Sequence, residues 1–199
     1  MIGIIDYGAG NLLSVKKALE HLKIECRVID SKEGFKDIDR IILPGVGAFG
    51  AAMQRLRSCR MLEDIREWVL SDKPFLGICL GMQLLFEESD ESRGVRGFGI
   101  FEGKVVRFKQ GKVPQIGWNQ VSIQKESCLL SGIDDLSFFY FLHGYFVEPK
   151  DTDIIIGTTE YGVIYPSMIK RGSIHAVQFH PEKSGVDGLR LLENWVRKC

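Results

Sequence analysis

The chain has 199 residues, and its 26 basic residues balance its 26 acidic ones, so the formal net charge at neutral pH is zero. A chain of this length buries about 70% of its unfolded surface, enough for one hydrophobic core, and we expect a single domain over residues 1–199. Without a net charge, the protein has no general attraction for nucleic acid or for an anionic membrane. We therefore exclude both as partners and expect a small molecule or another protein.

The cysteines show no metal-binding pattern. There are five, at positions 26, 59, 79, 128 and 199, and they form no CxxC or CxxH spacing. The odd count and the lack of a secretory segment favour reduced thiols in a cytoplasmic protein. No apolar run is long enough to span a bilayer. We expect a soluble protein without a metal ion or an organic cofactor.

The first half of the chain alternates short β-branched runs with amphipathic stretches, which is typical of repeated βαβ units. Strands are expected at 3–6, 26–30, 40–44 and 74–78, and helices at 11–22, 48–56, 60–70 and 82–87. The apolar runs in these strands show no polar alternation. That pattern indicates strands buried on both faces, in a parallel sheet with helices on each side.

The second half contains closely spaced strand candidates separated by turn residues. They lie at 103–109, 119–124, 138–146, 153–162, 163–170 and 173–180, and a helix is expected at 187–198. We expect these strands to be antiparallel and to extend the sheet. The predicted fold is therefore α/β, with a mostly parallel central sheet flanked by helices and extended by antiparallel strands.

A thiol stands between glycines where a predicted strand meets a predicted helix. Residues 77–81 read GICLG, which is the spacing of a nucleophile elbow with Cys79 as nucleophile. Gly77 and Gly81 would let the strand double back into the helix and present Cys79 at the carboxyl edge of the sheet. The helix N-terminus would also favour the thiolate. The alternative is a core cysteine in a glycine-containing strand.

A cysteine nucleophile needs a histidine to accept its proton and a third group to hold the imidazole. His180 ends a strand candidate and precedes Pro181 and Glu182. Proline fixes the backbone there, so Glu182 can accept a hydrogen bond from the ring of His180. The alternative is a strand-ending histidine beside a solvated glutamate. The other three histidines have simpler interpretations. His21 fits a solvated helix face, and His175 fits a half-buried strand position. His143 fits either a pocket wall or the end of a strand.

The glycine-rich segment 43–50, LPGVGAFG, follows a predicted strand and starts a predicted helix. Its backbone N–H groups, together with that of Leu80, would form an oxyanion hole for acyl transfer. Such a turn is also typical of phosphate binding. The segment lacks the lysine and hydroxyl of a P-loop, which disfavours that alternative.

The turn at 8–13, followed by Asp30 at the end of the next strand, raises the alternative of a dinucleotide site. Leu13 stands where the third glycine of that fingerprint belongs, so the helix cannot approach the strand closely. Asn11 as a helix N-cap is the simpler interpretation of this turn.

Seven segments in order along the chain together resemble class I, or triad-type, glutamine amidotransferases, and among them the glutaminase subunits of imidazole glycerol phosphate synthases. They are IIDYGAGN at 4–11, LPGVGAFG at 43–50, GICLGMQLLFEES at 77–89, PQIGWN at 114–119, FLHGY at 141–145, GTTEYG at 157–162 and QFHPEKS at 178–184. The resemblance implies a flavodoxin-like fold, no cofactor, and hydrolysis of glutamine to glutamate and ammonia. It also implies a heterodimer with a separate cyclase subunit, a (β/α)8 barrel. That subunit uses the ammonia to make imidazole glycerol phosphate and aminoimidazole carboxamide ribotide in histidine biosynthesis.

The resemblance also implies roles for individual residues. The catalytic triad matches Cys79, His180 and Glu182. The oxyanion hole matches Gly45, Val46, Gly47 and Leu80. The substrate-binding positions match Gln83, Glu91, His143, Gly144 and Tyr145, and the partner interface matches Asn11, Trp118 and Asn119.

Alternatives remain for several of these positions. Gln83 also fits an exposed helix face, Glu91 a solvated acidic cluster, and Trp118 a buried indole in a turn. Gly144 departs from the family, which usually has serine or threonine there, and the missing hydroxyl predicts weaker glutamine binding. The departure leaves open a paralogue that feeds ammonia to a different synthase. A catalytically silent binding module on the same fold is the further alternative.

Overall fold

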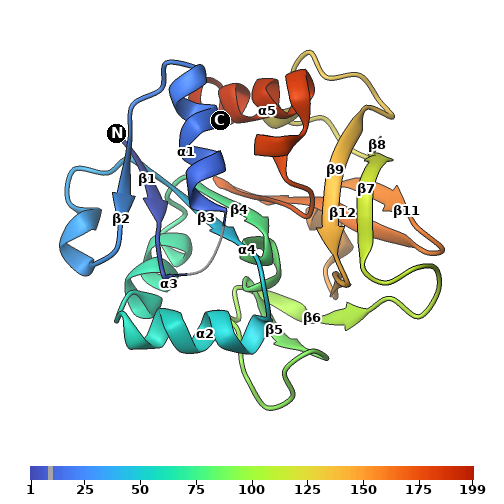
Figure 1. Cartoon of the computed structure of the whole chain (residues 1–199), viewed down its shortest axis with the longest axis horizontal. Helices are drawn as coiled ribbons and strands as arrows, with labels where there is room; N and C mark the ends of the chain where they lie inside the picture. The colour runs from blue at the N-terminus through green and yellow to red at the C-terminus, as the bar shows by residue number, and fades with distance from the viewer. Residues whose placement is uncertain (9–10) are drawn as a thin grey trace.

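The structure is a computed structural model that describes residues 1–8 and 11–199. Its main feature is a central sheet of eight strands (Figure 1). The strand order is β2-β1-β3-β4-β13-β12-β11-β8. Ala9 and Gly10, part of the glycine-rich turn considered as a dinucleotide site, lie outside the described residues.

Five neighbouring strands of this sheet are parallel. They are β1 (Ile2–Ile5), β2 (Cys26–Ile29), β3 (Arg40–Gly45), β4 (Phe75–Cys79) and β13 (Ile174–Val177). Gly45 pairs with Cys79, so β3 and β4 end side by side at one edge of the sheet. The predicted parallel sheet is confirmed, but the expectation that the strand at 173–180 is antiparallel is wrong, because β13 pairs parallel to β4 and antiparallel only to β12.

The antiparallel strands extend the sheet beyond β13, as predicted. They are β12 (Ile164–Arg171), β11 (Ile155–Glu160) and β8 (Ser122–Ile123). The other strands form two small sheets that the sequence did not predict. One has the order β10-β6-β5 (Tyr145–Pro149, Phe101–Arg107, Phe86–Ser89), and the other pairs β7 (Gln115–Gln120) with β9 (Phe138–His143).

Helices cover both faces of the central sheet (Figure 1). They are α1 (Leu12–His21), α2 (Phe49–Ser58), α3 (Leu62–Leu70), α4 (Leu80–Gln83) and α5 (Gly185–Arg197), with short 3₁₀ helices η1 (Lys32–Phe35), η2 (Cys128–Leu130), η3 (Thr152–Ile154) and η4 (Pro181–Lys183). Along β3, Ile41 and Leu43 pack into the core beneath α2 and α3, whereas Ile42 packs into the core beneath α1 and α5. Two cores explain why β3 is apolar without alternation.

Several predicted boundaries are wrong. The helix predicted at 82–87 is the single turn α4, and strand β5 begins at Phe86. The strand predicted at 138–146 is two strands that separate at Gly144, and the strand predicted at 119–124 is divided between β7 and β8. At 138–146 the apolar run is continuous, but its two parts pair with different strands, β7 and β6.

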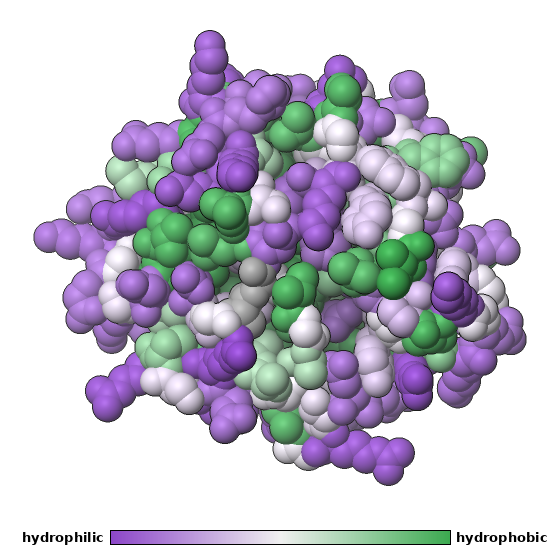
Figure 2. All heavy atoms as spheres, viewed as in Figure 1, coloured by the Kyte–Doolittle hydropathy of each residue, from purple (hydrophilic) through white to green (hydrophobic). Residues whose placement is uncertain are grey.

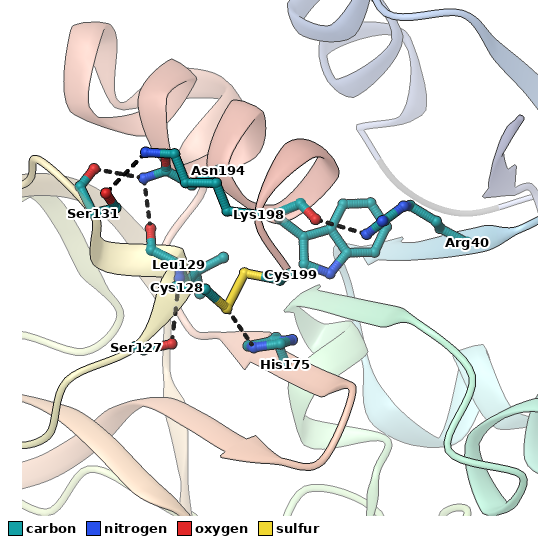
Figure 3. The surroundings of a disulfide bond; sticks show 10 residues. Arg40, Ser127, Cys128, Leu129, Ser131, His175, Asn194, Lys198 and Cys199 are labelled. Carbon is teal, nitrogen blue, oxygen red and sulfur yellow. Dashed lines mark hydrogen bonds between the residues drawn. A yellow bond between two sulfur atoms is a disulfide. The ribbon is translucent and has the colours of Figure 1, made fainter.

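The expectation of five reduced thiols is also wrong, because Cys128 and Cys199 form a disulfide (Figure 3). Their separation of 71 residues gave no sign of this contact, which arises because α5 carries the last residue of the chain onto η2. Cys26, Cys59 and Cys79 remain free. Within residues 1–8 and 11–199, no helix is long and apolar enough to cross a membrane.

Candidate active site

Cys79 occupies a sharp turn between β4 and α4. Its φ of 54° lies in the left-handed region, which a non-glycine residue adopts only when its surroundings enforce it. A Cβ on Gly81 would lie 1.9 Å from the carbonyl oxygen of Leu43, and a Cβ on Gly77 would lie 2.8 Å from that of Gly81. The glycines are therefore required by close backbone approach, as in a nucleophile elbow.

The elbow opens into a cavity of about 360 Å³. Residues of three groups line it: the glycine-rich loop, the elbow, and the segments around β6 and β9. They are Val46, Gly47, Cys79, Leu80, Gln83, Glu91, Arg107, Val113, Pro114, Leu142, His143, Gly144 and Tyr145. The volume suits a small amino acid or a molecule of similar size.

His180 and Glu182 form a buried pair on η4, directly after β13. The Nδ1 atom of His180 lies 2.8 Å from the Oε1 atom of Glu182, and both side chains are almost fully buried. The amide of Asn11 donates to the same Oε1 atom at 2.9 Å. Ser184 donates its hydroxyl to the carbonyl oxygen of His180 at 2.6 Å. The pair is thus held from the front of α1 and from the start of α5.

The charges around His180 favour its imidazolium form. Burial lowers the pKa of His180, but the charge of Cys79, a hydrogen bond to it, and Glu182 outweigh burial and raise the pKa to about 10. The Nε2 atom faces away from Glu182, on the side of the ring that interacts with Cys79. An imidazolium held in this way can give up its Nε2 proton.

A chain of two glutamine side chains connects the sulfur to the cavity wall. Gln178 donates to the sulfur of Cys79 at 3.6 Å, and Gln83 donates to Oε1 of Gln178 at 3.1 Å and to the carbonyl oxygen of Tyr145 at 2.9 Å. The sulfur also lies 3.8 Å from the carbonyl oxygen of Leu142. Gln83 is buried, so the alternative of an exposed helix face is wrong.

His143 is held as a neutral ring. Burial lowers its pKa to about 4; the hydrogen bond to Tyr145 opposes this, and the charge of His180 adds to it. Its Nδ1 atom donates to the carbonyl oxygen of Tyr145 at 2.8 Å, and Nε2 lies 3.3 Å from the hydroxyl of Tyr165. That hydroxyl donates to Gln115 at 2.9 Å. This network supports the cavity wall beneath Gly144 and Tyr145.

The glycine-rich loop brings backbone N–H groups beside the elbow. Val46 and Gly47 line the cavity with Leu80, and Gly47 has a φ of 100°. Gly45 lies one residue deeper, where a Cβ would meet the hydroxyl of Tyr7 at 2.5 Å. Tyr7 is buried, and burial together with the charge of Cys79 raises its pKa.

Two opposite charges face the cavity. Glu91 is half-buried and accepts a hydrogen bond from the backbone N–H of Phe49 at 2.6 Å, at the start of α2. It is therefore not simply a solvated member of an acidic cluster. Arg107, at the end of β6, lies opposite Tyr145 in the β6–β10 register, and its side chain forms no ion pair within the described residues.

The structure does not bring every predicted residue to the cavity. Trp118 and Asn119 lie on β7, outside the cavity lining, and Trp118 is 55% exposed, so the alternative of a buried indole in a turn is wrong. Asn119 donates to the carbonyl oxygen of Glu160. Asn11 stands at the N-cap position of α1, but its side chain forms no capping bond and contacts Glu182 instead. At Gly144, a Cβ would lie 3.4 Å from Val113, an ordinary contact.

Sequence reasoning missed two residues of the site. Gln178 lies within the QFHPE segment, two residues before His180, and its position in a strand was the only available signal. Arg107 resembles the other basic residues of its strand, and only the pairing with β10 brings it to the cavity. The described residues contain one cluster of three potential metal ligands, and it lies away from the cavity, at Cys128, His175 and Cys199.

Comparisons with known proteins agree with this geometry. Residues 3–199 match the family model of class I glutamine amidotransferases. The subunit HisH of imidazole glycerol phosphate synthase from Methanocaldococcus jannaschii is 52% identical over 197 residues, which cover 98% of each chain. The HisH subunit from Desulfitobacterium hafniense is 46% identical over 202 residues, covering 100% of this chain and 96% of its own.

Solved structures share the fold at lower identity. A crystal structure of a glutamine amidotransferase superposes with a TM-score of 0.78 at 20% identity, over 98% of this chain and 96% of that one. The structure of PurLQS from Thermotoga maritima superposes with a TM-score of 0.77 at 17% identity and the same coverage. On the family match and the full-length identities together, the chain belongs to the class I glutamine amidotransferases and, within them, to the HisH subunits of imidazole glycerol phosphate synthase.

Proposed function

We propose that Cys79, His180 and Glu182 carry the glutaminase reaction of this subunit. As a member of the HisH group, the chain hydrolyses glutamine and delivers the ammonia to a cyclase subunit in histidine biosynthesis. The observation that supports the assignment most strongly is the strained φ of Cys79 in a cavity next to the buried His180–Glu182 pair. Strain of this kind persists only where surrounding structure maintains it.

In the first half-reaction, the thiolate of Cys79 attacks the side-chain carboxamide carbon of glutamine. The carbonyl oxygen becomes an oxyanion, which the backbone N–H groups of Leu80 and of the Val46–Gly47 loop would stabilise. His180 then gives its Nε2 proton to the leaving nitrogen, and the C–N bond breaks to release ammonia. The product on the enzyme is a glutamyl thioester.

In the second half-reaction, water replaces ammonia. Neutral His180 takes a proton from the water, the resulting hydroxide attacks the thioester carbon, and the C–S bond breaks to give glutamate and the Cys79 thiolate. His180 is left as imidazolium, so the cycle closes without a net proton change on the triad. Glu182 holds the ring with Nε2 directed toward the reacting atoms throughout.

The two charges at the cavity fit the free amino-acid end of glutamine. Arg107 would bind the α-carboxylate and Glu91 the α-ammonium. This arrangement supplies the carboxylate contact that Gly144, with no hydroxyl, does not offer. Replacing Arg107 with Met should raise KM for glutamine about 10-fold or more with little change in kcat. Replacing Lys104, which lies on the same strand outside the cavity lining, is the matched control.

The exposed face of β7 and β9 is our candidate for the surface that binds the cyclase subunit. We expect that subunit to be a (β/α)8 barrel and the complex to be a heterodimer. Ile116, Trp118 and Phe138 are exposed there by 60%, 55% and 53%. On the face of the protein drawn in Figure 2, hydrophobic side chains form small patches among hydrophilic ones. Tyr140, paired with Trp118 across this small sheet, accepts the backbone N–H of His180 through its carbonyl oxygen. A partner on this face would therefore lie one strand from the triad. Asn119, on the same strand, belongs to this proposed surface, whereas Asn11 would act through Glu182.

Labelling with 6-diazo-5-oxo-L-norleucine, a glutamine-like electrophile, tests the assignment. We expect one adduct per chain, located on Cys79 by mass spectrometry, and none in the Cys79→Ala variant. Addition of the cyclase subunit with its nucleotide substrate should then couple glutamine consumption to imidazole glycerol phosphate formation. Failure of the label to reach Cys79 in the complex would support a silent module, and hydrolysis without coupling would support a different synthase.

A further inference from the structure

A second cysteine–histidine cluster lies where the end of the chain meets β13 (Figure 3). The sulfur of Cys128 lies 3.7 Å from Nε2 of His175. With the sulfur of Cys199, the three potential ligand atoms all lie within 4.8 Å of one another. They come from η2, from β13 and from the residue at position 199, and the glutaminase reaction uses none of them.

We propose that, when its two cysteines are thiols, this cluster binds one Zn²⁺ ion through Cys128, Cys199 and His175. Thiolate sulfur and imidazole nitrogen are the ligands that Zn²⁺ prefers. Bond lengths of about 2.3 Å to sulfur and 2.0 Å to nitrogen place tetrahedral S and N ligands about 3.6 Å apart. The observed separation of Cys128 and His175, 3.7 Å, is close to that value.

Hydrogen bonds hold the cluster together independently of the disulfide. Asn194, near the end of α5, donates to the carbonyl oxygens of Leu129 and Ser131 at 3.1 and 2.8 Å. Lys198 donates to the hydroxyl of Ser131 at 2.8 Å. These contacts fix the end of α5 on η2 (Figure 3). These contacts would keep both sulfurs near the imidazole after reduction, where two tetrahedral thiolate ligands have to lie about 3.8 Å apart.

His175 gains from a metal partner. It is 2% exposed, and its Nδ1 atom forms no hydrogen bond with the described residues. A buried imidazole with few polar contacts costs free energy, and a metal bond at Nε2 would give the ring a strong partner on the side of Cys128. The only side chain in hydrogen-bond range of Nε2 in the described chain is the sulfur of Cys128, so no stronger contact has to be broken.

Access and charge also suit a metal ion. A surface cavity of about 480 Å³ is lined by Cys128, Glu126, Ser127 and Lys170, among others, and reaches the Cys128 side of the cluster. Binding releases one proton from each thiol, and the two thiolates neutralise the charge of Zn²⁺. Lys170 then faces a site without net charge. In the oxidised chain the disulfide uses the same sulfurs, so the bond and the metal exclude each other.

Titration of the full chain with Co²⁺, a spectroscopic substitute for Zn²⁺, tests the proposal. The protein is first reduced with a phosphine, which does not compete as a thiol ligand, and is kept under anaerobic conditions. We expect a thiolate-to-cobalt charge-transfer band that saturates at one equivalent and disappears when Zn²⁺ is added. The Cys199→Ser variant, altered only at position 199, should lose at least about 10-fold in affinity. Cys26→Ser, which changes a free cysteine on β2, should behave as the parent chain.

A count of five thiols confirms before the titration that the disulfide is reduced. Two results would then overturn the proposal. One is the absence of a band that saturates at one equivalent. The other is an unchanged affinity in Cys199→Ser, which would place the metal elsewhere.

Discussion

Two cysteine–histidine pairs lie along the single segment that contains β13 and its extension to η4. His175, within the strand, contacts Cys128, and His180, just after the strand, interacts with Cys79. Both imidazoles are almost fully buried, at 2% and 1% exposure. The pairs thus share residue types and burial, and the groups behind each ring account for their difference.

A carboxylate forms a hydrogen bond with His180, whereas within the described residues no carboxylate forms one with His175. Glu182 contacts Nδ1 of His180 at 2.8 Å and is itself held by Asn11. At His175, burial lowers the pKa to about 4, and the charge of Lys170 contributes in the same direction. At His180, burial also lowers the pKa, but Cys79 and Glu182 outweigh it and raise the pKa to about 10. The same ring is therefore a proton carrier at one site and a neutral ligand at the other.

The largest expected effect comes from removing a sulfur from each pair. Cys79→Ala should reduce kcat for glutamine hydrolysis by about 10⁴-fold or more, because the covalent route is lost. Cys128→Ser should leave kcat within about two-fold and instead lower the free energy of unfolding by about 2–4 kcal/mol in non-reducing buffer, because the disulfide closes a loop of 71 residues. Steady-state kinetics of the assembled synthase and urea unfolding measure the two effects. A large activity loss in Cys128→Ser would show that the pairs are not independent.

The second effect concerns the carboxylate. Glu182→Gln keeps the shape of the side chain but removes the charge that stabilises the imidazolium, and kcat should fall by about 10³-fold with KM changed little. The pH profile of kcat should move to lower pH, because the imidazolium of His180 is less favoured. Glu193→Gln, on the exposed side of α5 and paired with Arg197, is the matched control and should behave as the parent enzyme. Activity within a few-fold of the parent would remove Glu182 from the triad.

The elbow at Cys79 and the contact between His180 and Glu182 were predictable because each is local in sequence, whereas their joint action stays a prediction. The glycines at 77 and 81 and the segment from His180 to Glu182 each lie within five residues, and the backbone geometry that they require is the geometry found. The cluster at Cys128 was not predictable, because its contacts join residues 47 and 71 positions apart. Local patterns encode turns and caps, whereas contacts between distant segments depend on how the whole sheet assembles.

The fold also has parts that the sequence predicted and parts that it did not. The parallel strands were predicted nearly to their ends, because their unbroken apolar runs and intervening helices are a periodic signal. The small sheets were missed, because two of their three pairings join strands that are not neighbours in sequence: β6 pairs with β10 as well as with β5, and β7 pairs with β9. Arg107 was missed as a cavity residue for that reason alone.

His143 is a third buried histidine to compare with His175 and His180. Within the described residues, neither a carboxylate nor a sulfur forms a hydrogen bond with its ring. Its pKa is lowered to about 4, so between pH 6.5 and 4 the unfolded chain binds a proton that the folded chain does not. The neutral, buried ring of His143 therefore contributes fully to the free energy of unfolding above pH 6.5, and this contribution is lost as the pH falls toward 4. The loss should reach about 3 kcal/mol. In His143→Phe, the free energy of unfolding should depend on pH less steeply in this range, as measured by urea titrations.

The smallest expected effect belongs to Asn11, which acts through Glu182. Its amide donates to the same Oε1 atom that contacts His180, and its Oδ1 atom accepts the hydroxyl of Ser14 at 2.6 Å. Asn11→Ala should lower kcat about 10-fold and leave KM for glutamine unchanged, because the carboxylate loses one of its two partners but keeps its charge. Asn11→Asp should cost more, because it places a like charge against Glu182. Ser14→Ala separates positioning from a general disturbance of α1: it keeps the contact to Glu182 and should stay within about two-fold of the parent. Equal losses in Asn11→Ala and Ser14→Ala would mean that the helix, and not the contact to the carboxylate, controls the rate.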